Sequence, residues 1–276
     1  MRKILLSILV SVLFVPCLHF SAFALKPSKV YLAVPDTMQL PYEKNTITAS
    51  DNVKLKSWTF LPAKDANNSI TLVLAYADAG NMSWWLNYGA VLSQMGYTVV
   101  LFDYRGFGES DDFAIDPKML YYNEFAKDLE AVVKFAKGKY TGNKTGIWCF
   151  SMGTIITTLA AKTIKPDFII GDSYVTDPAG IKKYYAPQKK EIDLPADANK
   201  YEAVLAGINV PMLVFSGDED EVTTQASIKK LQEKKPSLKM ISYKGGHMAG
   251  FGVLTDPKKF PGSEYVAAIN DFLKVE

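Results

Sequence analysis

The sequence predicts a single doubly wound, mainly parallel α/β domain that starts with an antiparallel hairpin. Short apolar runs of strand length alternate with longer segments whose apolar residues recur at helical spacing. Runs such as 70–76 and 97–102 lack polar alternation, which is typical of parallel strands covered on both faces. Because no repeat or linker interrupts the alternation, we expect one domain over residues 44–276, preceded by an extended lead-in over 25–43.

The first 24 residues have the pattern of a secretory signal peptide. The basic start Met1-Arg2-Lys3 is followed by the apolar run Ile4 to Val15 and by the small-residue site Ala22-Phe23-Ala24. We expect cleavage after Ala24 and export to a periplasm or out of the cell. The alternatives are an uncleaved anchor, for which the apolar run is short, and a lipoprotein at Cys17, which Pro16 disfavours.

Composition excludes several classes of function for the chain that remains after cleavage. The segment 1–24 holds two basic and no acidic residues, so the remainder has 29 of each. This balance argues against nucleic acid or an anionic membrane surface as a partner, and we expect no stable membrane span. Cys149 and His247 are then the only cysteine and the only histidine. A disulfide and a histidine-ligated metal site are therefore excluded, and we expect no metal ion or organic cofactor.

The expected elements follow one another along the chain as strands and helices with short connections. A turn at Asp51-Asn52 joins the two strands of the hairpin. Gly96 caps the first helix. We expect strands at 46–50, 53–60, 70–76, 97–102, 146–150, 168–171, 211–216 and 238–243, and helices at 84–95, 121–136, 152–162, 223–233 and 263–273. Residues 174–209 form a surface excursion with one or two short helices, too short for a large lid, so we expect a fairly open site.

The stretch around Ser151 has the form of a strand-to-helix nucleophile elbow. An apolar run ends at Phe150, Ser151 follows, and a small-residue helical run begins at Met152. Such a turn lifts a hydroxyl clear of the sheet and places the next backbone N–H, here that of Met152, where an oxyanion forms. The usual pattern is Gly-x-Ser-x-Gly, and Cys149 replaces its first glycine. We expect Cys149 to be a small buried side chain and not a reactive thiol.

Polar residues follow the carboxyl ends of several predicted strands, where ligands bind in sheets of this kind. Ser151 comes first, an acid loop with Asp218 and Asp220 follows a later strand, and His247 follows the last strand. A serine hydroxyl becomes a good nucleophile when a histidine takes its proton and a carboxylate orients that histidine. Ser151, one of the two acids and His247 therefore form a candidate triad.

Four motifs make residues 44–275 resemble the α/β-hydrolase superfamily, especially its Bem46-like and serine-aminopeptidase-like members. The resemblance implies Asp220 as the triad acid in preference to Asp218. It also implies an oxyanion hole built from the N–H of Met152 and that of Asp78 or Ala79. The motifs are Asp103-Tyr104-Arg105-Gly106-Phe107-Gly108-Glu109-Ser110, Ala79-Gly80-Asn81-Met82-Ser83, Gly217-Asp218-Glu219-Asp220-Glu221-Val222 and Gly245-Gly246-His247.

The resemblance implies a serine hydrolase that cleaves a carboxylic ester, thioester or amide through an acyl-Ser151 intermediate, and the predicted signal peptide implies that it is exported. Its partner would be a small-molecule or peptide acyl substrate. One alternative is an acyltransferase with the same triad. Another is a catalytically silent binding protein, because Tyr76-Ala77 replaces a common His-Gly pair and Asp78 adds a carboxylate. We expect the Asp78 side chain to point away from the oxyanion, Asp103 and Arg105 to be structural, and Ser173 to be a weak rival nucleophile.

Overall fold

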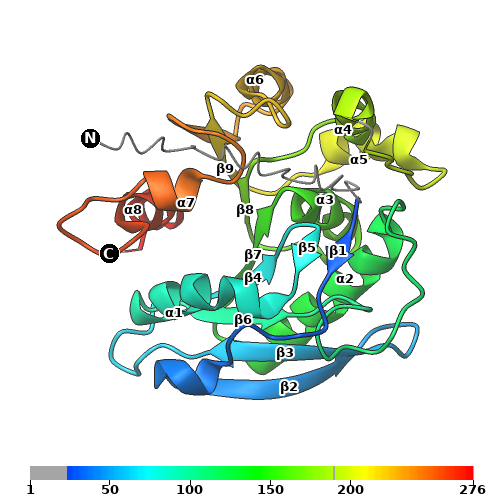
Figure 1. Ribbon diagram of the computed structural model, residues 1–276. Coiled ribbons are helices and arrows are strands. Elements are labelled where there is room, and N and C mark those ends of the chain that lie inside the picture. Colours follow the sequence, from blue (N-terminus) through cyan, green and yellow to red (C-terminus); the bar gives the residue numbers. More distant parts are fainter. Residues whose placement is uncertain (1–23, 189, 276) are drawn as a thin grey trace, which may run out of the picture.

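The structure is a computed structural model that describes residues 24–188 and 190–275. Its centre is an eight-stranded sheet in the order β10-β9-β8-β7-β4-β6-β3-β2 (Figure 1). Neighbouring strands from β10 to β6 are parallel, and β3 runs antiparallel to both β6 and β2. The predicted parallel sheet with an antiparallel hairpin is therefore confirmed. Residues 1–23 of the predicted signal peptide lie outside the described residues, which begin at Ala24.

The strands have the following bounds: β1 Lys26–Pro27, β2 Tyr42–Thr48, β3 Lys54–Phe60, β4 Ile70–Ala75, β5 Ala79–Gly80, β6 Thr98–Phe102, β7 Lys144–Phe150, β8 Ile169–Asp172, β9 Met212–Gly217 and β10 Lys239–Tyr243. The α-helices are α1 Leu86–Gln94, α2 Tyr122–Lys139, α3 Met152–Ile164, α4 Pro178–Tyr185, α5 Tyr201–Gly207, α6 Gln225–Lys234, α7 Gly250–Val253 and α8 Ser263–Leu273. The 3₁₀ helices are η1 Pro35–Met38, η2 Met82–Trp85, η3 Ala186–Gln188 and η4 Ala198–Lys200.

Helices cover both faces of the sheet, so the central strands are buried on both sides. Helices α1 and α8 lie on one side of it and α2 and α3 on the other (Figure 1). Trp148 of β7 is fully buried, with its ring packed near Tyr88 of α1 and its indole N–H donating to the hydroxyl of Tyr265 in α8. This two-sided burial explains why β4, β6 and β7 read as continuous apolar runs in the sequence.

The largest difference from the predicted elements lies at the N-terminus. Strand β2 begins at Tyr42, four residues before the predicted start, because it pairs with β3 as far as Phe60. Tyr42 and Glu43 belong to no alternating or continuous apolar pattern, so the sequence does not indicate that they are part of a strand. The lead-in also contains β1, which pairs in parallel with β5 just after β4. The short helix α7 was not predicted either.

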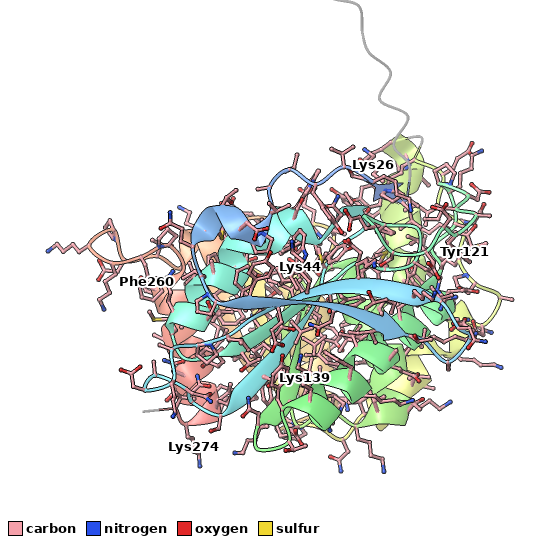
Figure 2. All side chains as sticks on the ribbon, turned by 90° about the horizontal axis from the view of Figure 1, so that it is seen from below. Lys26, Lys44, Tyr121, Lys139, Phe260 and Lys274 are labelled. Atoms are coloured by element: carbon pink, nitrogen blue, oxygen red, sulfur yellow. The ribbon has the colours of Figure 1, made fainter. Side chains whose placement is uncertain are left out.

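The outer strand β2 is protected by charge at the edge of the sheet. Figure 2 shows the hairpin of β2 and β3 crossing the near side of the molecule, with the labelled Lys44 and Lys139 beside it. Lys139 of α2 forms an ion pair of 2.6 Å with Glu43 of β2. Charged side chains of this kind oppose pairing with a further strand. None of the helices in the described residues combines the length and the apolar character needed to cross a membrane.

Candidate active site

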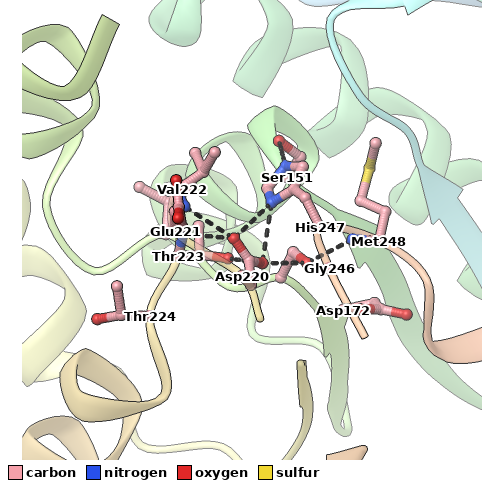
Figure 3. A network of polar contacts seen from close by, with 12 residues as sticks. Ser151, Asp172, Asp220, Glu221, Val222, Thr223, Thr224, Gly246, His247 and Met248 are labelled. Carbon is pink, nitrogen blue, oxygen red and sulfur yellow. Dashed lines mark hydrogen bonds and ion pairs between the residues drawn. The ribbon is translucent and has the colours of Figure 1, made fainter. Parts of the chain in front are cut away.

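The structure brings Ser151, His247 and Asp220 into one chain of hydrogen bonds (Figure 3). Ser151 follows β7, Asp220 follows β9 and His247 follows β10, so the carboxyl ends of three parallel strands at one edge of the sheet supply them. The Nε2 atom of His247 lies 2.8 Å from Oγ of Ser151. Its Nδ1 atom lies 2.9 Å from Oδ2 and 3.1 Å from Oδ1 of Asp220. This geometry suits proton transfer from the serine to the histidine.

Ser151 occupies a strained backbone conformation between β7 and α3. Its φ is 48° and its ψ is −117°, a combination that L-residues rarely adopt and that tends to occur at functional sites. The turn is tight because α3 starts directly against β4. A Cβ atom at Gly153 would lie 2.0 Å from the carbonyl oxygen of Ala75. The second glycine of the elbow is therefore required by this close approach.

Cys149 fits where the elbow pattern usually has glycine because its neighbours in the sheet are small. It pairs with Ala75 of β4 on one side and with Gly171 of β8 on the other. The thiol is fully buried, and its Sγ lies 3.3 Å from the carbonyl oxygen of Ile170. Burial raises the pKa of the Cys149 thiol to about 12. The side chain is therefore inert at neutral pH.

Asp220 is held as a carboxylate by several hydrogen-bond donors. Its Oδ1 accepts from the backbone N–H groups of Val222 (2.9 Å) and Thr223 (2.8 Å), and its Oδ2 accepts from the hydroxyl of Thr223 (2.5 Å). Burial acts to raise the pKa of Asp220, but His247 and the Thr223 donors outweigh it and lower the pKa to about 2. The side chain is fully buried, so its orientation toward His247 is fixed.

Ser173 belongs to this network but is poorly placed to act as a nucleophile. Its side chain is buried, its Oγ donates to Oδ2 of Asp220 at 2.8 Å, and it accepts from the N–H of Met248 at 2.7 Å. The hydroxyl therefore links the loop of the acid to the loop of the histidine. Next to it, Oδ1 of Asp172 accepts from the hydroxyl of Tyr243 at 3.1 Å. Burial raises the pKa of Asp172 to about 7.

A cavity of about 260 Å³ opens beside Ser151 and His247. Its apolar lining includes Leu120 and Ile155, and the excursion between β8 and β9 adds Ile181 and Ile192. The excursion also contributes Tyr185 and Lys190, while Ala24 and Asp78 come from other loops. The excursion, although too short for a lid domain, thus walls part of the cavity. Within the described residues, no group of three or more His, Cys, Asp or Glu side chains could hold a metal ion.

Known proteins resemble this chain both in sequence and in fold. A model of the serine aminopeptidase S33 family matches residues 79–171. The esterase Pf2001 of Pyrococcus furiosus has a similar structure, with a TM-score of 0.68 and 21% identity over 91% of this chain and 97% of that one. XC6422 of Xanthomonas campestris, described as an a/b serine hydrolase without lid, covers 84% of this chain with a TM-score of 0.59, 18% identity and 94% coverage of its own chain.

The chain therefore has the α/β-hydrolase fold. Among curated relatives, the uncharacterized membrane protein YNL320W of Saccharomyces cerevisiae is 24% identical over 75% of this chain and 72% of its own length. The lysophosphatidylserine lipase ABHD12 of Xenopus tropicalis is 35% identical over 92 residues. That match covers 32% of this chain and 22% of the relative.

The two residues predicted to supply the oxyanion donors both line the cavity beside Ser151. Met152 is the first residue of α3, so the helix offers its N–H no internal acceptor. Asp78 lines the cavity together with Ser151 and Met152. Its carboxylate is turned toward Lys190, whose Nζ lies 4.0 Å from Oδ2. The roles of Met152 and Asp78, like those of the triad residues, remain predictions from this arrangement.

The N-terminal lead-in holds the loop that contains Asp78, a contact that the sequence did not indicate. The N–H of Lys26 donates to the carbonyl oxygen of Asp78, and that of Ser28 donates to the carbonyl oxygen of Gly80, each at 2.8 Å. The amide of Asn81 returns two hydrogen bonds, to the carbonyl oxygens of Ser28 (3.0 Å) and Val30 (2.8 Å). Strand β1 is too short to show periodicity, and its partners are distant in sequence.

Asp103 and Arg105 have the structural roles expected of them. Oδ1 of Asp103 accepts from the N–H of Met82 at 2.7 Å, and its Oδ2 accepts from the hydroxyl of Tyr31 at 2.6 Å. Arg105 forms a buried ion pair of 2.7 Å with Asp128. Asp103 thus fixes the start of η2 just after the Asp78 loop. The hydroxyl of Thr223, which donates to Asp220, was not predicted, whereas the bond from the N–H of Val222 to Asp220 is the one that an Asx-turn leads one to expect.

Proposed function

We propose that this chain is a serine hydrolase that cleaves a carboxylic ester, thioester or amide through an acyl-Ser151 intermediate. The observation that carries the proposal is the 2.8 Å contact between Oγ of Ser151 and Nε2 of His247 at a strained elbow. The fold supports it, because this superfamily uses such an elbow to present a nucleophilic serine. The names of two similar proteins, an esterase and a lipase, are consistent with an ester substrate.

The reaction would proceed in two halves. In the first, Oγ of Ser151 attacks the acyl carbon while Nε2 of His247 takes the hydroxyl proton. The oxyanion would be held by the N–H groups of Met152 and Asp78. The bond to the leaving group then breaks, and His247 returns the proton to that group. In the second half, His247 takes a proton from water, the resulting hydroxide attacks the acyl carbon, and Ser151 is released with its proton restored.

Asp220 would serve both halves by orienting His247. Its carboxylate accepts from Nδ1, which leaves Nε2 unprotonated and directed at Ser151. The negative charge also stabilises the imidazolium formed when His247 holds the serine proton. The small apolar cavity beside Ser151 suits an acyl group of modest size. An ester is the easier substrate, because its alcohol leaves more readily than the amine of an amide.

Hydrolysis of a series of p-nitrophenyl esters and a thioester tests the proposal. We expect turnover by the wild type and a loss of at least roughly 10³-fold in Ser151→Ala, while Ser173→Ala keeps measurable activity. Product analysis with an added alcohol distinguishes hydrolysis from acyl transfer, because a transferase forms the new ester in place of the free acid. A folded wild type that turns over none of these substrates would contradict the proposal and favour a silent binding protein.

We also propose that the protein is exported to a periplasm or secreted. Support comes from the basic, apolar and small-residue pattern of residues 1–24. Ala24, where cleavage is predicted, is buried and lines the cavity with Ser151. Cleavage there would place the new N-terminus, Leu25, beside the cavity. N-terminal sequencing of protein from the extracytoplasmic fraction should begin at Leu25, and a start at Met1 in the cytoplasmic fraction alone would contradict export.

A further inference from the structure

Asp78 places a carboxylate beside the position where the proposed reaction develops negative charge. It lies in the loop after β4, three residues beyond the end of the strand, and lines the cavity together with Ser151 and His247. Its own backbone N–H is one of the two proposed oxyanion donors, so its side chain carries a charge on the same residue. An unneutralised carboxylate there would raise the energy of an oxyanion, because like charges in a partly dry site repel strongly.

Lys190 of the excursion is the cation placed to offset this carboxylate. Its Nζ lies 4.0 Å from Oδ2 of Asp78 and 4.1 Å from the ring centre of Tyr185. The Lys190 side chain is 13% exposed and that of Asp78 is 34% exposed. Among the described residues, Asp78 is the one carboxylate within 4.0 Å of this ammonium group. The lysine therefore points into the cavity and not out to solvent.

The charges of the two groups favour each other. Burial raises the pKa of Asp78, and the charge of Lys190 is the largest effect that opposes the rise. His247 and Lys26 act on Asp78 in the same direction, but more weakly. Burial lowers the pKa of Lys190, and Asp78 opposes that change. Removing the lysine would leave a carboxylate with weaker compensation in the cavity, whereas removing both groups would leave no charge.

We propose that Lys190 is a positioning residue whose charge neutralises Asp78, so that an oxyanion can form beside Ser151 in a chain with Ala77-Asp78 at this turn. The inference rests on the proposed serine hydrolase function. It gives the excursion between β8 and β9 a role in the reaction in addition to walling the cavity. The link is specific, since the excursion supplies the cation and the loop after β4 supplies the carboxylate.

Kinetics of single and double variants test this with a neutral short-chain ester. Lys190→Met should lower kcat by roughly 10- to 100-fold and change KM little, because an uncompensated charge acts on the transition state. Lys190→Arg should retain most of the activity. If Lys190→Met lowers kcat a hundredfold, the double variant with Asp78→Asn should have a kcat at least tenfold higher than that of Lys190→Met. Lys182→Met is the matched control, because this exposed lysine of α4 pairs with Asp193 and should leave kcat unchanged.

Two results would overturn the role of Lys190. One is a kcat for Lys190→Met equal to that of the control. The other is a loss that Asp78→Asn does not relieve, which would indicate that the lysine acts on the substrate itself. Urea unfolding of the wild type, Lys190→Met, Asp78→Asn and the double variant gives a readout without activity. We expect the two substitutions to be coupled by at least about twofold in the unfolding equilibrium constant. If the two substitutions are coupled in unfolding but the folded wild type hydrolyses no ester, the ion pair stands and the proposed function is overturned. If they are not coupled, the ion pair between Lys190 and Asp78 is overturned.

Discussion

Replacing Asp220 by asparagine tests how the buried carboxylate orients His247. The backbone N–H groups of Val222 and Thr223 both donate to Oδ1, and neither can become an acceptor. The amide oxygen of the asparagine must therefore take the Oδ1 position, which leaves its NH₂ group at the Oδ2 position. That position lies 2.9 Å from Nδ1 of His247. An NH₂ group there donates to Nδ1 and favours the tautomer with the proton on Nε2.

The wrong tautomer removes the base from the reaction. With its proton on Nε2, His247 donates to Ser151 and cannot accept the serine proton. The lost negative charge also ceases to stabilise the imidazolium. We therefore expect kcat to fall by roughly 10⁴-fold, about 5.5 kcal/mol in activation free energy, the size of effect known for a triad carboxylate changed to its amide.

Steady-state ester hydrolysis measures this loss, and urea unfolding shows whether the variant is folded. The matched control is Asp218→Asn in the same loop, whose Oδ1 accepts from the N–H of Gly245 at 2.9 Å and does not contact His247. We expect the control to keep kcat within about threefold of wild type. Asp220→Asn with more than a tenth of wild-type kcat, or a control with an equal loss, would refute the orientation argument.

Two further substitutions test the packing and the electrostatics around the elbow. Gly153→Ala places a Cβ 2.0 Å from the carbonyl oxygen of Ala75, so urea unfolding should show a free energy of unfolding lower by about 1–3 kcal/mol or more. The control Gly138→Ala adds its Cβ in open space on α2 and should raise the free energy of unfolding by about 0.5–1 kcal/mol. An unchanged stability of Gly153→Ala would contradict the tight turn. Asp172 has its pKa raised to about 7, so between about pH 4 and 7 the folded chain keeps a proton that the unfolded chain has released, and the free energy of unfolding falls as pH rises. Asp172→Asn should remove this fall and gain stability relative to wild type between pH 5 and 8; an equal difference at both pH values would contradict the assignment.

The sheet and its order of elements could be predicted because local sequence and burial agree. Continuous apolar runs such as 70–76 and 146–150 belong to strands covered on both faces, and the segments between them carry helical spacing. The positions of Ser151, Asp220 and His247 at one sheet edge followed from the same alternation, since parallel strands end on one side. Their catalytic roles are proposals supported by this geometry.

Other features depend on contacts between distant segments that no local pattern encodes. The pairing of β1 with β5 depends on backbone hydrogen bonds from Lys26 to Asp78 and from Ser28 to Gly80, which carry no side-chain signature. The hydroxyl of Ser173 links the loops of Asp220 and Met248 only because β8 brings it between them in the folded sheet. The wall of the cavity, including Lys190, comes from an excursion with little periodicity, so its closeness to Asp78 could not be read from spacing.

Labelling with a fluorophosphonate, followed by peptide mapping, tests the central claim most directly. The reagent forms a covalent bond only with a serine that a base has activated, so it reports on the nucleophile itself. We expect one modified peptide in the wild type, with the phosphonyl group on Ser151, and the same labelling in Ser173→Ala. Ser151→Ala should remain unlabelled. A folded wild type without label, or with label on another residue, would contradict the assignment of Ser151 as the nucleophile.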